Sequence, residues 1–141
     1  MPTIENIGVL DLVAGTHKLR DPVRTRLIRI LDAEGEAEMN PPRVPFTDVH
    51  SFVFLDLPED DPLAVQYPWK VFLPDQAARI VGLLNDALAR DLDVLVCCTA
   101  GVARSGAVVE VGVSMGFSDL KTYRSSNTRV LRLLTDAAYP D

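Results

Sequence analysis

The sequence predicts an α/β domain with a central, mostly parallel sheet flanked by helices, and three neighbouring stretches support this prediction. Residues 92–97 form a short apolar run rich in β-branched residues, which is typical of a strand covered on both faces. Before this run, apolar side chains recur at helical spacing from Pro74 to about Arg90. After it, residues 104–115 can form a second helix that ends at Gly116. Helix, strand and helix therefore alternate, as a covered parallel sheet requires.

Two further strands are expected in the first half of the chain. Residues 4–13 are apolar and β-prone, and residues 50–57 place apolar side chains on both faces of an extended chain. Residues 21–31 fit either a helix that starts at Pro22 or a strand over their second half. Residues 32–45 are polar and broken by prolines, so a surface loop is predicted there.

The last part of the chain predicts two more helices. Ser118 and Asp119 are typical of the N-terminus of a short helix, and residues 127–138 predict a final amphipathic helix. The densest group of aromatic side chains lies earlier, at Tyr67, Trp69 and Phe72. Because aromatic side chains bury large areas, we expect these three to anchor the core, with the alternative that one packs beside a substrate ring.

The loop that joins the apolar strand to the second helix has the features of a phosphate site. Residues 99–103 are small and include Gly101, which can adopt a positive φ and let the backbone close around a ligand. The N–H groups of such a loop and the N-terminus of the helix favour an anion. Cys98 begins the loop and Arg104 ends it, so that the loop and the cation favour the nucleophilic thiolate. The guanidinium can bind two phosphoryl oxygens at once, and no metal or other cofactor is expected.

The segment C-T-A-G-V-A-R-S at residues 98–105 resembles the C-x-x-G-x-x-R-[S/T] signature of the cysteine-dependent protein phosphatases, and it is most similar to their dual-specificity branch. The resemblance implies a dual-specificity phosphatase-like fold with the phosphate loop between a strand and a helix, and a strand at residues 25–30. It also implies that Cys98 is the nucleophile and that Arg104 binds the phosphate. The remaining phosphate-binding positions are then Thr99, Ala100, Gly101, Val102, Ala103 and Ser105. The Ser105 hydroxyl is expected to donate a hydrogen bond to the Cys98 sulfur and ease its departure from phosphorus.

One residue departs from the family pattern. The family has a His before the nucleophile, whereas this chain has Cys97. Because that His orders the loop through hydrogen bonds in the family, we expect lower activity, or activity shifted to higher pH. Cys97 is expected to face the core, since neighbouring strand residues point to opposite faces. The alternative is that Cys97 is a redox partner for Cys98, although a disulfide between adjacent residues is strained.

The general acid is expected in the acidic turn at residues 58–62. In the family, an Asp on a loop after a strand protonates the leaving oxygen, and it lies roughly thirty to forty residues before the nucleophile. Asp60 lies in that window and is the predicted acid. Asp61 in the same turn, and then Asp56 just before it, are the alternatives.

Composition excludes several classes of function. The chain of 141 residues fits a single domain, 1–141, and its formal net charge of −6 disfavours nucleic acid and anionic membranes as partners. No apolar run approaches the roughly 18 residues of a membrane span. Two adjacent cysteines make no disulfide framework, and the first residues lack the pattern of a signal peptide, so a cytoplasmic protein is expected. The oligomeric state stays open.

The sequence is therefore interpreted as a protein tyrosine or dual-specificity phosphatase that hydrolyses phosphomonoesters through a phospho-cysteine intermediate. The loop between Cys98 and Arg104 includes no Lys, whereas loops of this superfamily that bind phosphoinositides are more basic, so a phosphorylated protein or peptide is the expected substrate. The preference between phosphotyrosine and phosphoserine or phosphothreonine stays open.

Two other classes of protein are compatible with a cysteine in an anion-binding loop. One is a pseudophosphatase that binds phosphorylated partners without turnover. The other comprises arsenate reductases and rhodanese-like sulfurtransferases, which also carry a Cys in an anion-binding loop. Arsenate reductases are expected to have further cysteines and the sulfurtransferases a different loop pattern, and this sequence has neither.

Overall fold

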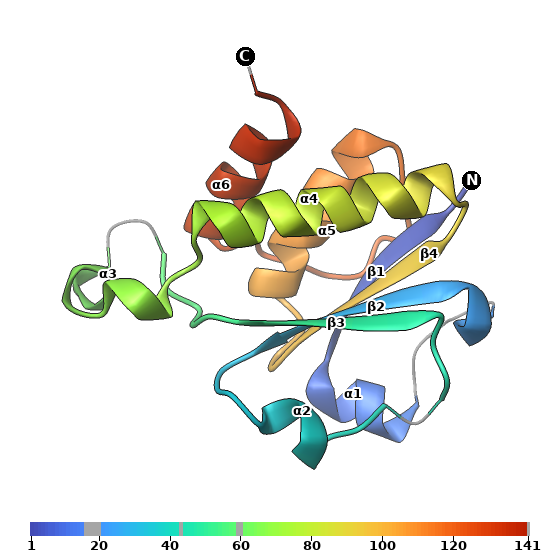
Figure 1. The fold of residues 1–141 in the computed structure, drawn as a ribbon, viewed down its shortest axis with the longest axis horizontal. Helices are drawn as coiled ribbons and strands as arrows, with labels where there is room; N and C mark the ends of the chain where they lie inside the picture. The colour runs from blue at the N-terminus through green and yellow to red at the C-terminus, as the bar shows by residue number, and fades with distance from the viewer. Residues whose placement is uncertain (16–20, 43, 59–60, 141) are drawn as a thin grey trace.

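The centre of the molecule is a five-stranded, all-parallel sheet with the strand order β3-β2-β4-β1-β5 (Figure 1). The structure is a computed structural model that describes residues 1–15, 21–42, 44–58 and 61–140. Its strands are β1 (Thr3–Gly8), β2 (Thr25–Leu31), β3 (Asp48–Val53), β4 (Asp93–Cys98) and β5 (Ser118–Asp119). The predicted α/β class with a parallel sheet is confirmed, and residues 25–31 form a strand rather than a helix.

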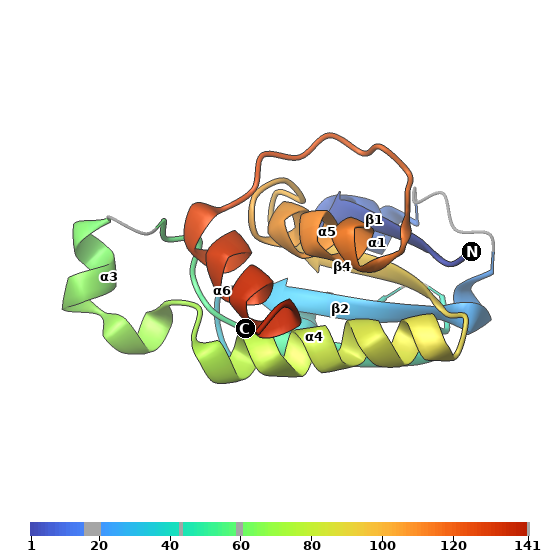
Figure 2. The same ribbon diagram turned by 90° about the horizontal axis from the view of Figure 1, so that it is seen from above.

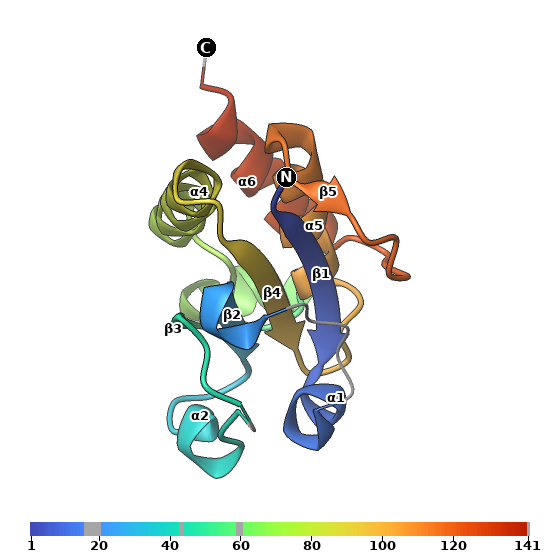
Figure 3. The same ribbon diagram turned by 90° about the vertical axis from the view of Figure 1, so that its right-hand side faces the viewer.

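Helices cover both faces of the sheet. They are α1 (Val9–Ala14), α2 (Glu36–Met39), α3 (Pro62–Gln66), α4 (Pro74–Ala89), α5 (Arg104–Met115) and α6 (Thr128–Ala138), with short 3-10 helices η1 (Pro22–Arg24) and η2 (Pro68–Lys70). Figure 3 shows α4, α5 and α6 on one side of the strands and α1 and α2 on the other. In the part of the chain that the structure describes, no helix has the length and apolar character needed to cross a membrane.

The core has two parts because β2 and β4 are buried at every position and present apolar side chains to both faces. The larger part fills the space between the sheet and α4, α5 and α6, and it includes Ile28, Val96 and Leu84. The smaller part lies on the opposite face, where Leu12 of α1 packs near Cys97. Figure 2 shows α6 between α4 and α5, while α3 stands apart from the sheet.

The predicted strand at residues 4–13 is wrong in its second half. Strand β1 ends at Gly8, which pairs with Cys98 at the end of β4. Beyond that point β4 offers no further strand to pair with, so the backbone groups of the next residues are satisfied within a helix instead. Helix α1 then ends at Gly15, whose φ of 75° is left-handed.

Three other expectations also need correction. Ser118 and Asp119 form the short strand β5, which pairs with the start of β1, rather than a helix. The predicted surface loop at residues 32–45 contains helix α2. Of the three aromatic residues expected in the core, Phe72 is buried but Trp69 is 68 % exposed.

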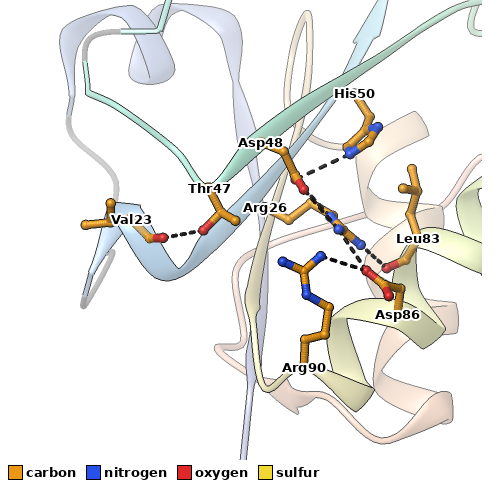
Figure 4. Close-up of polar contacts among 8 residues, drawn as sticks. All are labelled: Val23, Arg26, Thr47, Asp48, His50, Leu83, Asp86 and Arg90. Carbon is orange, nitrogen blue, oxygen red and sulfur yellow. Dashed lines mark hydrogen bonds and ion pairs between the residues drawn. The ribbon is translucent and has the colours of Figure 1, made fainter.

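A cluster of charged side chains lies at the amino ends of β2 and β3 (Figure 4). Arg26 is only 3 % exposed, and its Nε and Nη2 atoms donate to the two carboxylate oxygens of Asp48 at 2.9 and 3.0 Å. Nη2 also donates to Asp86 at 2.9 Å, and Nη1 donates to the Leu83 carbonyl oxygen at 2.7 Å. His50 Nε2 lies 3.3 Å from Asp48 Oδ1. Every nitrogen of the Arg26 guanidinium therefore has an acceptor, and the cluster joins β2 and β3 to α4.

Candidate active site

The Cys98–Arg104 loop lies at the carboxyl edge of the sheet, where ligands bind in open α/β sheets. Strand β4 lies between β1 and β2 and ends at Cys98, and α5 begins at Arg104. The loop is therefore flanked by the ends of two neighbouring strands, which bring in residues far away in the sequence.

Gly101 is required by the shape of this loop. Its φ is 75°, and a Cβ at this position would lie 2.2 Å from the backbone nitrogen of Gly8. The loop is held against β1 by Asn6, a fully buried side chain whose Nδ2 donates to the Gly101 carbonyl oxygen at 2.7 Å and to the Tyr123 carbonyl oxygen at 3.0 Å. A larger residue at position 101 would separate the loop from the strand.

The carbonyl groups of the loop point into the surrounding protein. In addition to Gly101, three loop carbonyl oxygens accept hydrogen bonds from backbone N–H groups outside the loop: Thr99 from Val9 at 3.3 Å, Val102 from Ser125 at 3.2 Å, and Ala103 from Asn127 at 3.1 Å. Because C=O and N–H are trans across a planar peptide, the N–H that follows each of these carbonyls points the opposite way, toward the inside of the loop. The loop therefore presents a set of N–H groups to an anion.

Cys98 and Ser105 meet at the floor of this loop. The Cys98 Sγ lies 3.1 Å from the Ser105 Oγ, and both residues are buried. The structure thus brings together the two side chains that the sequence analysis paired. The serine hydroxyl is placed to donate a hydrogen bond to the sulfur.

Cys97 has a different environment from Cys98. It lies in the smaller core part with Leu12 and Leu95, so the prediction that it faces the core is confirmed. Burial raises the pKa of the Cys97 thiol to about 12. A thiol with such a pKa stays protonated at neutral pH and is a poor nucleophile.

Arg104 folds back over the loop and is only 4 % exposed. Its Nη1 donates to Asp32 Oδ1 at 2.7 Å and to the Phe54 carbonyl oxygen at 2.8 Å, while Nη2 donates to Thr99 Oγ1 at 3.2 Å. Thr99 Oγ1 in turn donates to Asp32 Oδ2 at 2.8 Å. The guanidinium is therefore fixed by groups from the segments after β2 and after β3 and from the loop itself.

Asp32 is the site residue that the sequence analysis missed. It directly follows β2, so the strand order places it beside the end of β4, and this position is the signal that could have indicated it. Partial burial raises the pKa of Asp32, but the hydrogen bonds from Thr99 and Arg104 and the charge of Arg104 more than offset that effect. The pKa of Asp32 consequently lies below its ordinary value, and the group is a carboxylate at neutral pH.

The three predicted general acids have different positions. Asp60 lies outside the described residues. Asp61 caps α3 by accepting from the Leu63 backbone N–H at 2.8 Å, and α3 stands apart from the sheet (Figure 1). Asp56 accepts a hydrogen bond from Asn127 Nδ2 at 2.7 Å, and the backbone N–H of Asn127 donates to Ala103 of the Cys98–Arg104 loop. Of the described candidates, Asp56 is therefore the one tied to the loop.

A cavity of about 300 Å³ lies next to two groups that hold Arg104. Its walls include Asp32 and Phe54, both of which accept hydrogen bonds from Arg104. Leu55, Trp69, Lys70 and Glu34 are also in the lining, so the cavity is largely apolar, with one cation and two carboxylates at its edge.

No protein-family model matches the chain, and a comparison with curated proteins finds no match. Among the described residues, no group of three or more His, Cys, Asp or Glu side chains is arranged to hold a metal ion. The functional argument therefore rests on the residues and geometry given above.

Proposed function

We propose that this protein hydrolyses phosphomonoesters through a phospho-cysteine intermediate. The observation that carries the proposal is the arrangement of Cys98 and Ser105, 3.1 Å apart at the two ends of a loop that bonds its carbonyl groups to the surrounding protein and that leads into the buried Arg104. A nucleophile, a hydrogen-bond donor to it and an oxyanion-binding cation are the parts that phosphoryl transfer to a thiolate needs.

In the first half of the reaction, the Cys98 thiolate attacks phosphorus in line with the ester oxygen. An S–P bond forms, the P–O ester bond breaks, and the leaving oxygen takes a proton from a carboxylic acid. The loop N–H groups and the Arg104 guanidinium bind the three remaining phosphoryl oxygens, where charge is concentrated in the transition state. Asp60 is our proposed acid on the basis of the family resemblance, and Asp56 is the alternative supported by its bond to Asn127.

In the second half, water attacks the phospho-cysteine. The same acidic residue, now deprotonated, accepts a proton from the water as its oxygen bonds to phosphorus. The S–P bond breaks, and the Ser105 hydroxyl donates a hydrogen bond to the departing sulfur, which stabilises the thiolate. Inorganic phosphate is released and the enzyme is regenerated.

The proposed substrate is a phosphorylated protein or peptide. The phosphate loop includes no Lys between Cys98 and Arg104, and the chain has a net charge of −6, which makes polyanionic ligands poor partners. The largely apolar cavity lined by Phe54, Leu55 and Trp69 suits a side chain better than a charged headgroup.

A second candidate function is the binding of phosphorylated partners without turnover. One observation favours it: Cys97 occupies the position of the loop-ordering His and points into the smaller core part. Such a protein would still bind a phosphate group at the loop but would not hydrolyse the phosphomonoester.

The test is hydrolysis of a small aryl phosphate between about pH 5 and about pH 8 with a chelator present. The wild type is compared with Cys98→Ser, and with Cys97→Ser as the matched control for the neighbouring thiol. The proposal expects turnover in the wild type and in Cys97→Ser, and none in Cys98→Ser. Turnover that survives in Cys98→Ser would refute the phospho-cysteine, whereas no wild-type turnover together with binding of a phosphopeptide would establish the recognition module.

A further inference from the structure

We infer that Asp32 is a positioning residue that holds the Arg104 guanidinium with one edge free to bind the phosphate. This inference rests on the proposed function, and it adds to the reaction a residue that the C-x5-R signature does not contain. The three observations behind it are the atoms that Asp32 contacts, the state of its carboxyl group, and the elements from which the contacts come.

The contacts of Arg104 lie at one end of its guanidinium. Nη1 donates to Asp32 and to the Phe54 carbonyl oxygen, and Nη2 donates to Thr99. No hydrogen bond joins Nε to any of the described residues. Nε and the second N–H of Nη2 lie side by side along the other edge, which is the pair of donors that binds two oxygens of one phosphoryl group. Asp32 therefore fixes the group from the side away from that edge.

The same edge is used differently at Arg26. There, Asp48 accepts from both Nε and Nη2, at 2.9 and 3.0 Å (Figure 4). A carboxylate that competed with phosphate for Arg104 would take this bidentate position. Asp32 does not, so its contact is compatible with a bound phosphate, and we assign it to orientation rather than to competition.

Asp32 also differs from a general acid. Its carboxylate accepts from both Arg104 Nη1 and Thr99 Oγ1, which stabilises the ionised form. Its partners are Thr99 on the loop and Arg104 at the start of α5, and the same Arg104 Nη1 also donates to the Phe54 carbonyl oxygen after β3. Asp32 and Phe54, which follow β2 and β3, therefore both hold Nη1 of the guanidinium.

The experiment compares Asp32→Ala and Asp32→Asn with the wild type in aryl phosphate hydrolysis. Because a misplaced binding group costs about 10²-fold in rate, Asp32→Ala is expected to lower kcat by about that factor. KM is expected to change less than about 3-fold, since loss of a negative charge beside the phosphate offsets the poorer orientation in the ground state. Asp32→Asn keeps an acceptor for Arg104 Nη1 and is expected to recover most of kcat. Asp136→Ala, which breaks an exposed Asp–Arg pair on α6, is the control.

Two further measurements separate positioning from acid catalysis. If Asp32 is a positioning residue, Asp32→Ala should lose the same fraction of kcat for substrates with good and with poor leaving groups. The alkaline limb of the pH–rate profile should also remain in Asp32→Asn. A double-mutant cycle predicts that Asp32→Ala costs nothing further in an Arg104→Ala background, because Asp32 acts through Arg104. The inference would be overturned if Asp32→Ala lost more kcat for poor leaving groups than for good ones. It would also be overturned if Asp32→Ala lowered kcat as much in the Arg104→Ala background as in the wild type.

The outcomes also distinguish this inference from the proposed function. If the wild type hydrolyses the aryl phosphate and folded Asp32→Ala does so with equal kcat, the inference is wrong and the function stands. If both Asp32→Ala and Asp32→Asn lower KM and leave kcat intact, Asp32 competes with phosphate and the positioning role is refuted. If the wild type neither hydrolyses the ester nor binds tungstate, the proposed function fails and the inference fails with it.

Discussion

Arg26 and Arg104 are two buried arginines that bind aspartates at opposite ends of the sheet, and they differ in which donors are used. Arg26 lies at the amino end of β2, and each of its three guanidinium nitrogens donates to a protein acceptor (Figure 4). Arg104 lies beyond the carboxyl end of β4, and its Nε makes no hydrogen bond to the residues that the structure describes. Their exposed fractions, 3 % and 4 %, are nearly the same.

The comparison shows how a structural ion pair differs from a binding site in one molecule. A buried guanidinium whose donors are all satisfied joins elements together and has no donor left for a ligand. A buried guanidinium with a donor edge free of protein acceptors gains from an anion. Arg26 therefore holds β2, β3 and α4 together, whereas Arg104, which ends the loop that begins at Cys98, keeps a donor edge that we propose binds phosphate.

The largest expected effect is at Arg104 itself. Arg104→Ala removes the cation from the transition state and is expected to lower kcat/KM for an aryl phosphate by about 10³-fold or more. The steady-state rate is the measurement, with Arg79→Ala as the control, because Arg79 lies over the Phe52 ring on the surface of α4. A loss of less than about 10-fold would show that the two arginines do not differ as we describe.

Gly101→Ala tests whether the loop needs its close approach to β1. The new Cβ would lie 2.2 Å from the Gly8 nitrogen, so the loop must move, and a displaced loop is expected to lower kcat by about 10²-fold. Gly35→Ala is a matched control, because Gly35 also has a positive φ, of 83°, with no atom within 4 Å of its added Cβ. It shares the backbone strain, about 1 to 2 kcal/mol, without the clash. Equal rates in the two variants would contradict the description of the loop.

Arg26→Ala is expected to reduce stability rather than catalysis. It leaves Asp48 and Asp86 without their main partner, and since both are partly exposed, the cost is about 2 kcal/mol rather than that of a fully buried pair. Urea unfolding measures this change, and kcat per folded molecule is expected to stay at the wild-type value. A loss of kcat comparable with that of Arg104→Ala would remove the distinction between the two arginines.

The smallest expected effect concerns pH. The hydrogen bond from Arg26, opposed by burial and aided by the charge of Arg26, lowers the pKa of Asp48 from its ordinary value. A group with a lowered folded-state pKa contributes stability above its unfolded pKa, about 3.9, and loses it as the pH falls through the folded pKa. The free energy of unfolding of Asp48→Asn should therefore fall less steeply than that of the wild type below about pH 4. Parallel curves would show that Asp48 contributes nothing.

The parts of this molecule that could be predicted from sequence are those fixed by local pattern. The apolar strand β4, the glycine at 101 and the Cys98–Arg104 spacing lie within one short segment, so the loop was predicted with its residues in place. Helix α4 was likewise indicated by its apolar spacing. The contact between Cys98 and Ser105 was also predicted, whereas the contacts of Thr99 and Arg104 with Asp32 were not.

The missed features depend on contacts between distant residues. Asp32 binds Arg104 across a separation of 72 residues, and only the strand order brings them together. The end of β1 at Gly8 follows from the end of its partner β4, which the sequence of residues 4–13 does not encode. Trp69 was expected in the core because large aromatic side chains usually bury much area. It is instead exposed and lines the same cavity as Asp32.

The central claim, that Cys98 is phosphorylated during turnover, is tested most directly by trapping the intermediate. The protein is mixed with an aryl phosphate, quenched in acid within the first turnovers, digested and examined by mass spectrometry. Our account predicts one phosphoryl group on the peptide that contains Cys98, absent from Cys98→Ser and enriched in Ser105→Ala, in which departure of the sulfur is slowed. Turnover with no phosphoryl group on that peptide in either the wild type or Ser105→Ala, or with a phosphoryl group on another residue, would contradict the account.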